Sequence, residues 1–242
     1  MKVLSIGNSF SQDAHRWLHT MAAYDGVELE TVNLYIGGCS LQMHWDNLRE
    51  NLPAYDLERN GGPAEGKISI ADALKLEAWD VVTLQQASPD CGFYESYQPY
   101  LRDLTAFVRE NCPGARLYFH QTWAYEHGAT HPAFARYGHD QKDMYRRHTA
   151  CAQRAAAEME ASLIPAGLVI QTLRETVPSF DYQNGGMTLC RDGYHLTLDY
   201  GRYAAAATWY RVLLGGTAKA QAFPAFQADL LQQINGVIGQ LL

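Results

Sequence analysis

The sequence has no run of basic residues and no apolar stretch that approaches the length of a membrane-spanning helix. Acidic residues outnumber basic ones, and the formal net charge is -7 at pH 7. Nucleic acids and anionic membrane surfaces both attract basic patches, so this charge balance argues against either as a partner. A helix that crosses a bilayer needs about 20 consecutive apolar residues, and no segment provides them.

Cysteine is also scarce, and no two cysteines form a CxxC pair. The chain has 5 cysteines, an odd number, and they are scattered along its length. This favours reduced, buried thiols over a disulfide framework. The first residues lead into an apolar strand without the basic region and long apolar segment of a secretory signal peptide. We therefore expect a cytoplasmic protein, unless a leader has been trimmed from a secreted one.

What the sequence does contain is the composition of an ordinary globular domain. Of its 242 residues, 47% are apolar and 19% are charged, and this length suits one domain with a substantial core. We find no internal repeat, no low-complexity tract and no linker that would divide the chain. Residues 1–242 are therefore expected to form a single domain.

Short apolar strands alternate with helical patterns about five times along the chain. Strands are expected at Met1–Ile6, Val27–Ile36, Trp79–Leu84, Ala115–His120 and Leu163–Pro165. Helices are expected at Ser11–Tyr24, Leu41–Asn51, Ile68–Glu77, Tyr97–Asn111, Lys142–Ser162, Gly167–Thr176, Leu198–Leu214 and Ala225–Leu241. A surface hairpin or excursion is expected in the irregular stretch that ends at Gly66. This alternation predicts a three-layer α/β/α sandwich whose parallel sheet has about five strands.

In such a fold the carboxyl ends of the parallel strands meet at one edge of the sheet, where ligands and catalytic groups gather. After the fifth strand, a long loop brings Asp192 and His195 back to this edge. Short hydrogen-bonding residues follow the other strands, at Gly7-Asn8-Ser9, Gly37-Gly38-Cys39-Ser40, Gln85-Gln86-Ala87-Ser88 and His120-Gln121-Thr122-Trp123. This edge is therefore expected to hold a nucleophile, amide donors and a base.

The residue types at this edge match the needs of nucleophilic catalysis. A serine hydroxyl becomes a nucleophile when an adjacent imidazole takes its proton, and the imidazole needs a carboxylate that fixes its tautomer. Ser9, His195 and Asp192 supply these three groups. The tetrahedral oxyanion also needs preplaced donors. The candidates are the backbone amides of Ser9 and Gly38 and the side-chain amide of Gln86, with Gln85 as second choice.

Together these blocks resemble the SGNH (GDSL-type) hydrolase superfamily. Gly7-Asn8-Ser9 is similar to its Gly-Asp-Ser block, and Asp192-Gly193-Tyr194-His195 resembles its terminal Asp-x-x-His block. Gly38 falls where the superfamily keeps an oxyanion-hole glycine. Ile6–Ser11, Leu84–Ser88 and Gln121–Tyr125 look like a bacterial branch of it. The resemblance implies a flavodoxin-like sheet, the SGNH hydrolase fold, and esterase or acyl-hydrolase activity without metal or cofactor, often the deacetylation of carbohydrates.

Two positions depart from the pattern of the superfamily. Asn8 replaces an Asp, and we expect little effect because the neighbouring Ser9 makes the attack. The third block reads Gln85-Gln86-Ala87-Ser88, whereas the superfamily has Gly-x-Asn-Asp, in which the Asn side chain donates to the oxyanion. A glutamine can also donate from its side-chain amide, so Gln86 is the expected substitute.

Other polar residues near this edge have structural explanations. Ser11 is expected to be a helix N-cap, and Ser88 precedes a proline in a loop. The loop Glu126–His139 is expected to be a lid beside the site. The spacing of His120, His127, His131 and His139 matches no compact metal site, so no metal is expected. Substrate contacts are expected at Asn8, Gln121, Trp123 and Tyr125.

The leading hypothesis is a serine hydrolase that cleaves a small acyl ester, such as an O-acetyl group on a carbohydrate, through an acyl-enzyme. One alternative is a non-catalytic carbohydrate- or protein-binding module on the same fold, which the altered third block suggests. Another is an acyltransferase that uses the same triad. A Ser9 hydroxyl within hydrogen-bond reach of His195 favours an enzyme, whereas a filled edge favours a binding module.

Overall fold

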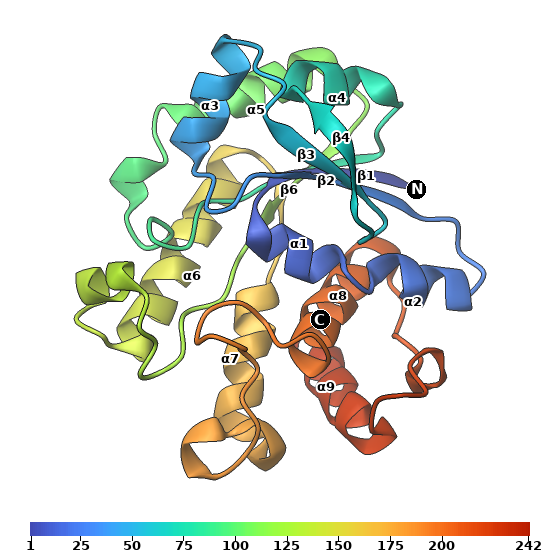
Figure 1. Ribbon diagram of the computed structural model, residues 1–242, viewed down its shortest axis with the longest axis vertical. Helices are drawn as coiled ribbons and strands as arrows, with labels where there is room; N and C mark the ends of the chain where they lie inside the picture. The colour runs from blue at the N-terminus through green and yellow to red at the C-terminus, as the bar shows by residue number, and fades with distance from the viewer.

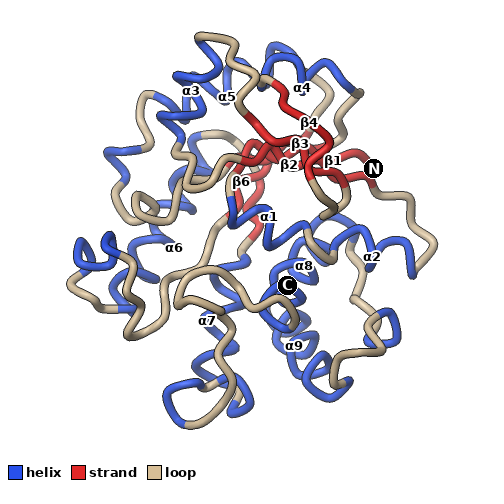
Figure 2. Tube along the Cα trace, in the orientation of Figure 1, coloured by secondary structure: helices blue, strands red, loops and turns tan.

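A seven-stranded sheet lies between two layers of helices in the computed structural model, which describes residues 1–242 (Figure 1). Figure 2 shows the strands gathered in the middle of the molecule. They run in the order β4-β3-β2-β1-β5-β6-β7 across the sheet. Their bounds are β1 Lys2–Gly7, β2 Glu30–Tyr35, β3 Tyr55–Arg59, β4 Ala64–Ile68, β5 Val81–Leu84, β6 Arg116–His120 and β7 Ser162–Ile164. The three-layer α/β/α sandwich predicted from the sequence is confirmed.

The expected number of about five strands is too low for the whole sheet. The parallel strands β2, β1, β5, β6 and β7 match that expectation. The stretch predicted to hold a hairpin or excursion adds β3 and β4, an antiparallel hairpin at the edge of the sheet that extends past Gly66 to Ile68. Most of β4 is exposed, so it lacks the apolar pattern that marks a strand in the sequence. Asn60 and Gly61, with φ of 53° and 66°, provide its tight turn.

The central strand is β1, which pairs with β2 on one side and β5 on the other. Leu4 and Ile6 pack into the core on one face of the sheet and Val3 into the core on the other. This strand therefore reads as a nearly continuous apolar run, as buried parallel strands do. The strand order reverses between β1 and β5, and open α/β sheets bind ligands at such a switch point.

Helices cover both faces of the sheet (Figure 1). The core on one face includes residues of α1 Ser9–His15, α2 Leu18–Tyr24, α7 Ala166–Thr176, α8 Tyr200–Leu214 and α9 Ala228–Leu241. The core on the other face includes residues of α3 Leu41–Arg49, α4 Ile70–Leu76, α5 Tyr100–Asn111 and α6 Gln141–Glu158. These bounds agree with the predicted helices to within a few residues, except in the first helical segment.

The helix expected at Ser11–Tyr24 is two helices, α1 and α2, which are separated at Arg16 and Trp17. The prediction that Ser11 is the N-cap is wrong, because Asn8 caps α1 by accepting a hydrogen bond from the Phe10 N–H. Ser11 completes this cap by accepting a hydrogen bond from the Asn8 N–H at 3.0 Å. Helix α1 therefore begins at Ser9.

The glycine of the β3–β4 turn lies against the break between α1 and α2. A Cβ on Gly61 would be 2.8 Å from the Arg16 Cα, so only glycine allows this close approach.

None of the helices combines the length and apolar character needed to cross a membrane. All of the cysteines are buried and unpaired.

Candidate active site

The candidate nucleophile, Ser9, lies at the carboxyl end of the central strand and is the first residue of α1. The strand ends at Gly7, where a Cβ would lie 2.0 Å from Ser11 Oγ. Glycine therefore leaves room for the hydroxyl that completes the cap of α1. This turn holds Ser9 at the edge of the sheet with 9% of its surface exposed.

Asp192 and His195 lie on the loop between α7 and α8, and this loop returns to Ser9. His195 Nε2 is 3.0 Å from Ser9 Oγ, and His195 Nδ1 is 2.7 Å from Asp192 Oδ2. Asp192 Oδ1 accepts hydrogen bonds from the backbone N–H groups of Tyr194 at 3.1 Å and His195 at 2.7 Å. The structure therefore brings together the serine, histidine and aspartate that the sequence singles out.

The hydrogen bonds around Asp192 determine its charge. Burial by itself would raise the pKa of Asp192, but hydrogen bonds from the His195 ring and from two backbone N–H groups lower it overall. The ionised carboxylate is an acceptor for the Nδ1–H of His195. With its proton on Nδ1, the ring presents Nε2 as the acceptor for the Ser9 hydroxyl proton.

Ser9 and His195 line a cavity of about 260 Å³. No lysine, arginine, aspartate or glutamate lines this cavity, so it suits a small uncharged group. Its walls include Tyr35 at the end of β2, Gly37 and Gly38 after β2, Ser88 and Pro89 after β5, and His131 and Tyr194 from the loops nearby. His131 belongs to the segment predicted to be a lid. The other aromatic side chains of that segment, Phe134 and Tyr137, are buried against the fold.

Two backbone amides at this cavity are available as donors. The N–H groups of Ser9 and Gly38 make no hydrogen bond within the protein, and both residues line the cavity. Gly38 has a φ of 66°, a conformation that glycine adopts without strain. The structure therefore places both backbone donors expected from the sequence beside the candidate nucleophile.

The structure does not bring either predicted glutamine donor to the cavity. The Gln86 amide nitrogen donates to Ser96 O at 3.2 Å and to Ser96 Oγ at 3.1 Å, and Gln86 Oε1 accepts from the Leu41 N–H at 3.0 Å. The Gln85 amide nitrogen donates to Asn8 Oδ1 at 2.6 Å, and its oxygen contacts His120 Nδ1 at 2.7 Å. The prediction of Gln86, or Gln85 second, as an oxyanion donor is contradicted because both side chains are bonded inside the core.

Three of the four predicted substrate contacts also lie away from the cavity. Gln121, Trp123 and Tyr125 are buried and do not line it, so these predictions are wrong. Trp123 stacks on Phe10 at 4.6 Å, and its Nε1–H donates to the Tyr194 carbonyl at 2.7 Å. Trp123 therefore packs against Phe10 and Tyr194, which line the cavity, without lining it itself. Asn8 does line the cavity, but its amide nitrogen donates to the Cys39 carbonyl at 3.1 Å.

Asp13 is a buried residue of this region that the sequence reasoning missed. Its carboxylate accepts hydrogen bonds from Arg202 Nε at 2.7 Å, from the Leu196 N–H at 2.9 Å and from Arg191 Nη1 at 3.2 Å. Asp13 lies on α1, and Arg191 and Leu196 flank the loop that carries Asp192 and His195. Asp13 follows Ser9 by four residues, so the two side chains lie on the same face of the helix. This spacing is the feature of the sequence that could have pointed to Asp13.

A second buried ion pair holds the other side of the same loop. Arg174 Nη2 is 3.3 Å from Glu126 Oε1, and both side chains are almost fully buried. The Glu126 carboxylate also accepts a hydrogen bond from the Leu189 N–H at 3.2 Å, and the Glu126 N–H donates to the Gly193 carbonyl at 2.7 Å. Nothing in the local sequence marks this pair, because its members are 48 residues apart.

The histidines considered as metal ligands do not gather. No group of three or more histidine, cysteine, aspartate or glutamate side chains is arranged to hold a metal ion. His120 is buried beneath α1, and burial lowers its pKa to about 3. It therefore stays neutral in the folded protein and contacts the Gln85 side chain.

Comparisons with known proteins give relatives of the whole fold. A family model described as "Domain of unknown function (DUF4886)" matches residues 2–230. The crystal structure of a DUF4886 family protein from Bacteroides uniformis is 35% identical and has a TM-score of 0.90, over 99% of this chain and 93% of that one. No curated protein matches the chain.

More distant structures share the architecture. A candidate SGNH hydrolase from Slackia heliotrinireducens is 23% identical with a TM-score of 0.58, over 86% of this chain and 96% of its own. The acetylxylan esterase Axe2 from Geobacillus stearothermophilus is 14% identical with a TM-score of 0.54, over 87% of this chain and 92% of its own. These likenesses identify the fold as that of the SGNH hydrolases.

Proposed function

This chain belongs to the DUF4886 family, and we propose that it is a serine hydrolase that cleaves esters through Ser9, His195 and Asp192. The observation that carries the proposal is the continuous hydrogen-bonded array from Ser9 Oγ to His195 Nε2 at 3.0 Å and from His195 Nδ1 to Asp192 Oδ2 at 2.7 Å. Each link is within the reach required for proton transfer.

In the first half of the reaction, Ser9 Oγ attacks the ester carbonyl carbon while His195 Nε2 takes the hydroxyl proton. Asp192 holds the ring in the required tautomer and stabilises the imidazolium that forms. When the tetrahedral intermediate collapses, His195 gives this proton to the departing alcohol oxygen. The acyl group then stays on Ser9 as an ester.

In the second half, water attacks the acyl-enzyme with His195 as its base. A second tetrahedral intermediate collapses, the acid product leaves, and the proton returns to Ser9 Oγ. Apart from the ester and the water, no step needs a group that the chain does not carry. The reaction is therefore complete with the three side chains and their oxyanion donors.

The negative oxygen that forms in each half is stabilised by the free N–H groups of Ser9 and Gly38. We assign the third donor to the Ser88 hydroxyl, which lines the cavity beside them. Ser88 Oγ lies 2.8 Å from the hydroxyl of the buried Tyr125. When Tyr125 donates to Ser88, the Ser88 proton is free to meet the oxyanion.

The size and lining of the cavity support a small acyl ester as substrate. About 260 Å³ accommodates a short acyl group such as acetyl, and the absence of charged side chains from the lining suits a neutral ester. Tyr35 and Tyr194 provide aromatic surface at the same cavity, which suits a carbohydrate alcohol. We therefore propose O-acetyl groups on carbohydrates as the first substrates to test.

The first experiment compares hydrolysis of p-nitrophenyl acetate by the unaltered protein and by Ser9→Ala. We expect the substitution to lower kcat by at least about a thousandfold, because it removes the nucleophile that the other groups serve. A fluorophosphonate probe is expected to label the unaltered protein at Ser9 and to leave Ser9→Ala unlabelled. Unchanged turnover in Ser9→Ala would overturn the assignment.

The matched control is Ser162→Ala, an exposed serine on the edge strand β7, which is expected to retain full turnover and labelling. If neither turnover nor labelling is detected in the unaltered protein, the binding-module alternative replaces the enzyme. If acyl groups pass to an added alcohol faster than to water, the acyltransferase alternative applies. The products of the reaction therefore separate the three functions.

A further inference from the structure

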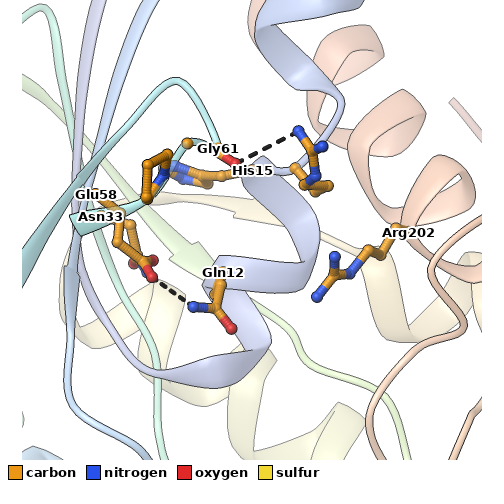
Figure 3. A pocket seen from close by; sticks show the side chains of 9 residues that line it. Gln12, His15, Asn33, Glu58, Gly61 and Arg202 are labelled. Atoms are coloured by element: carbon orange, nitrogen blue, oxygen red, sulfur yellow. Dashed lines mark hydrogen bonds between the residues drawn. The ribbon is translucent and has the colours of Figure 1, made fainter.

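A second cavity lies beside α1, away from Ser9. It has a volume of about 360 Å³, and no hydrophobic residue lines it. Its walls come from α1, β2, β3, the β3–β4 turn and α8. Figure 3 shows Gln12 and Glu58 joined by a hydrogen bond on one side, with Arg202 extending from the opposite element. The cavity shares no lining residue with the Ser9 cavity.

Glu58 is the acidic group of this second cavity and is 8% exposed. One of its carboxylate oxygens accepts a hydrogen bond from Asn33 Nδ2 at 2.9 Å, and the other accepts one from Gln12 Nε2. Burial raises the pKa of this carboxyl group despite those bonds. Each oxygen has a further lone pair, so a ligand hydroxyl can donate to Glu58 without displacing either amide.

Two arginines supply the basic side of the cavity. Arg202 uses only its Nε–H within the protein, as a donor to Asp13 at 2.7 Å, and its Nη groups have no protein partner. Arg16 makes one long hydrogen bond, from Nη1 to the Gly61 carbonyl at 3.5 Å. Free guanidinium donors in a fixed plane match the oxygens of a carboxylate or a phosphate.

A buried, unsatisfied nitrogen also borders the cavity. His15 is 1% exposed, its Nε2 is 2.8 Å from Ser5 Oγ, and its Nδ1 has no hydrogen-bond partner. Buried polar atoms in folded proteins nearly always have a partner. This nitrogen is itself closed off from the cavity, so the ligand contacts are assigned to Glu58 and the two arginines instead.

We propose that this cavity is a second ligand site, which binds a small hydroxylated anion of about the size of a monosaccharide. The anionic group meets the free guanidinium donors of Arg16 and Arg202. A hydroxyl of the same ligand donates to Glu58. The volume of about 360 Å³ lies in the range of small-molecule sites. Sugar acids and sugar phosphates share this chemistry, and the two are separated by experiment.

The experiment measures binding by isothermal titration calorimetry to the full chain, with D-glucuronate and glucose 6-phosphate as probes. Glucose lacks the anionic group, and acetate lacks the hydroxyls. We expect at least one of the two sugar anions to bind about tenfold or more tightly than either control, because the site recognises both features. The tighter of the two sugar anions identifies the natural anionic group as carboxylate or phosphate.

Two variants test the assigned residues. Arg16→Gln and Glu58→Gln are each expected to weaken binding by about tenfold, the effect of losing one charge-assisted hydrogen bond. Arg16 is partly exposed, so Arg16→Gln is expected to fold normally. It therefore tests the site even if Glu58→Gln, which changes a buried residue, folds poorly. The matched control is Arg102→Gln, whose side chain is 72% exposed on α5 and which is expected to bind as the unaltered protein does.

The result that overturns the second site is the absence of binding by both sugar anions, or binding that Arg16→Gln leaves unchanged. Glucose binding as tightly as the sugar anions would also overturn it. Binding to Ser9→Ala is expected to be unchanged, since the two cavities have separate walls. The second site and the proposed hydrolase activity therefore succeed or fail independently.

Discussion

At the scale of single residues, the candidate site differs most from the SGNH pattern in the groups proposed to donate hydrogen bonds to the oxyanion. The third-block glutamines are bonded inside the core, and the backbone offers two free N–H groups. Ser88 is the remaining polar side chain of that block and lines the cavity. Its neighbour Tyr125 is buried with Ser88 as its hydroxyl partner. We therefore propose that the Ser88 hydroxyl, oriented by Tyr125, takes the place of an asparagine amide as donor.

Ser88→Ala is expected to lower kcat for p-nitrophenyl acetate by about a hundredfold and to change KM little, because an oxyanion donor acts mainly on the transition state. Ser88→Thr retains a hydroxyl and is expected to recover part of the rate. Steady-state kinetics of the two variants provide the measurement. A Ser88→Ala variant with unaltered kcat would show that the two backbone amides suffice.

Individual residues also show which parts of the candidate site can be predicted from the sequence and which cannot. Ser9, Asp192 and His195 follow from their order and from the strand before Ser9, and the structure brings them within hydrogen-bond distance. The orientation of Gln85 and Gln86 does not follow from sequence, because adjacent glutamines carry the same groups. Their partners, such as Asn8 and Ser96, are chosen by the tertiary fold.

At the scale of elements, helix α1 links the proposed nucleophile to the loop that carries the proposed base. Ser9 begins the helix, and Asp13, one turn later, accepts hydrogen bonds from Arg191, Arg202 and the Leu196 N–H. Asp13 has no exposed surface. We therefore expect the distance between Ser9 and His195 to depend on the ion cluster around Asp13, which touches neither side chain.

Asp13→Asn is expected to destabilise the protein by about 3 kcal/mol, because it removes a fully buried charge that pairs with the mostly buried Arg202 and with the more exposed Arg191. At temperatures where the variant is folded, we expect kcat and the rate of fluorophosphonate labelling to fall together as the His195 loop loosens. Urea unfolding and labelling kinetics measure the two effects separately.

The control for this substitution is Asp103→Asn, which removes a carboxylate that pairs with an exposed arginine on α5. It is expected to change both stability and kcat little, as surface ion pairs contribute little. A destabilised Asp13→Asn variant that keeps the full labelling rate would assign Asp13 to stability alone. Its role in positioning the loop would then be excluded.

Elements differ in how well the sequence predicts them. Of the five parallel strands, β1, β2, β5 and β6 are mostly buried between helices, and their apolar runs locate them. The β3–β4 hairpin is held by edge hydrogen bonding and by a turn at Asn60-Gly61, so its strands need no apolar alternation. Its contribution to the sheet, and to the wall of the second cavity, could not be predicted from periodicity.

At the scale of the whole molecule, buried histidines link stability to pH. Burial lowers the pKa of each of four fully buried imidazoles to about 3; these belong to His15, His44, His120 and His148. In the unfolded chain a histidine has a pKa of about 6.5. Between these values the unfolded state binds more protons than the folded state, so the free energy of unfolding falls as the pH falls.

At pH 5 each of these histidines is expected to reduce the free energy of unfolding by about 2 kcal/mol relative to neutral pH. The combined loss of about 8 kcal/mol approaches the whole stability of a typical domain. Urea unfolding at pH 7 and pH 5 is therefore expected to show a steep loss of stability. Equal free energies of unfolding at the two pH values would contradict this origin of acid sensitivity.

A matched pair of substitutions tests the assignment to buried imidazoles. His148→Gln removes one buried group and is expected to reduce the difference between pH 7 and pH 5 by about 2 kcal/mol. His127→Gln removes an exposed imidazole and is expected to leave that difference unchanged. Comparing differences between pH values cancels any effect that either substitution has on stability itself.

The distance along the chain between Ser9 and His195 has a consequence for protein synthesis. The two residues are 186 positions apart, so a ribosome makes the proposed nucleophile long before it makes the proposed base. A chain that is released before residue 195 carries a serine hydroxyl with no imidazole to activate it. If the proposed triad is correct, unfinished products of translation are expected to be inactive toward esters, and hydrolytic activity would report that the polypeptide has been made past the loop between α7 and α8 and has folded.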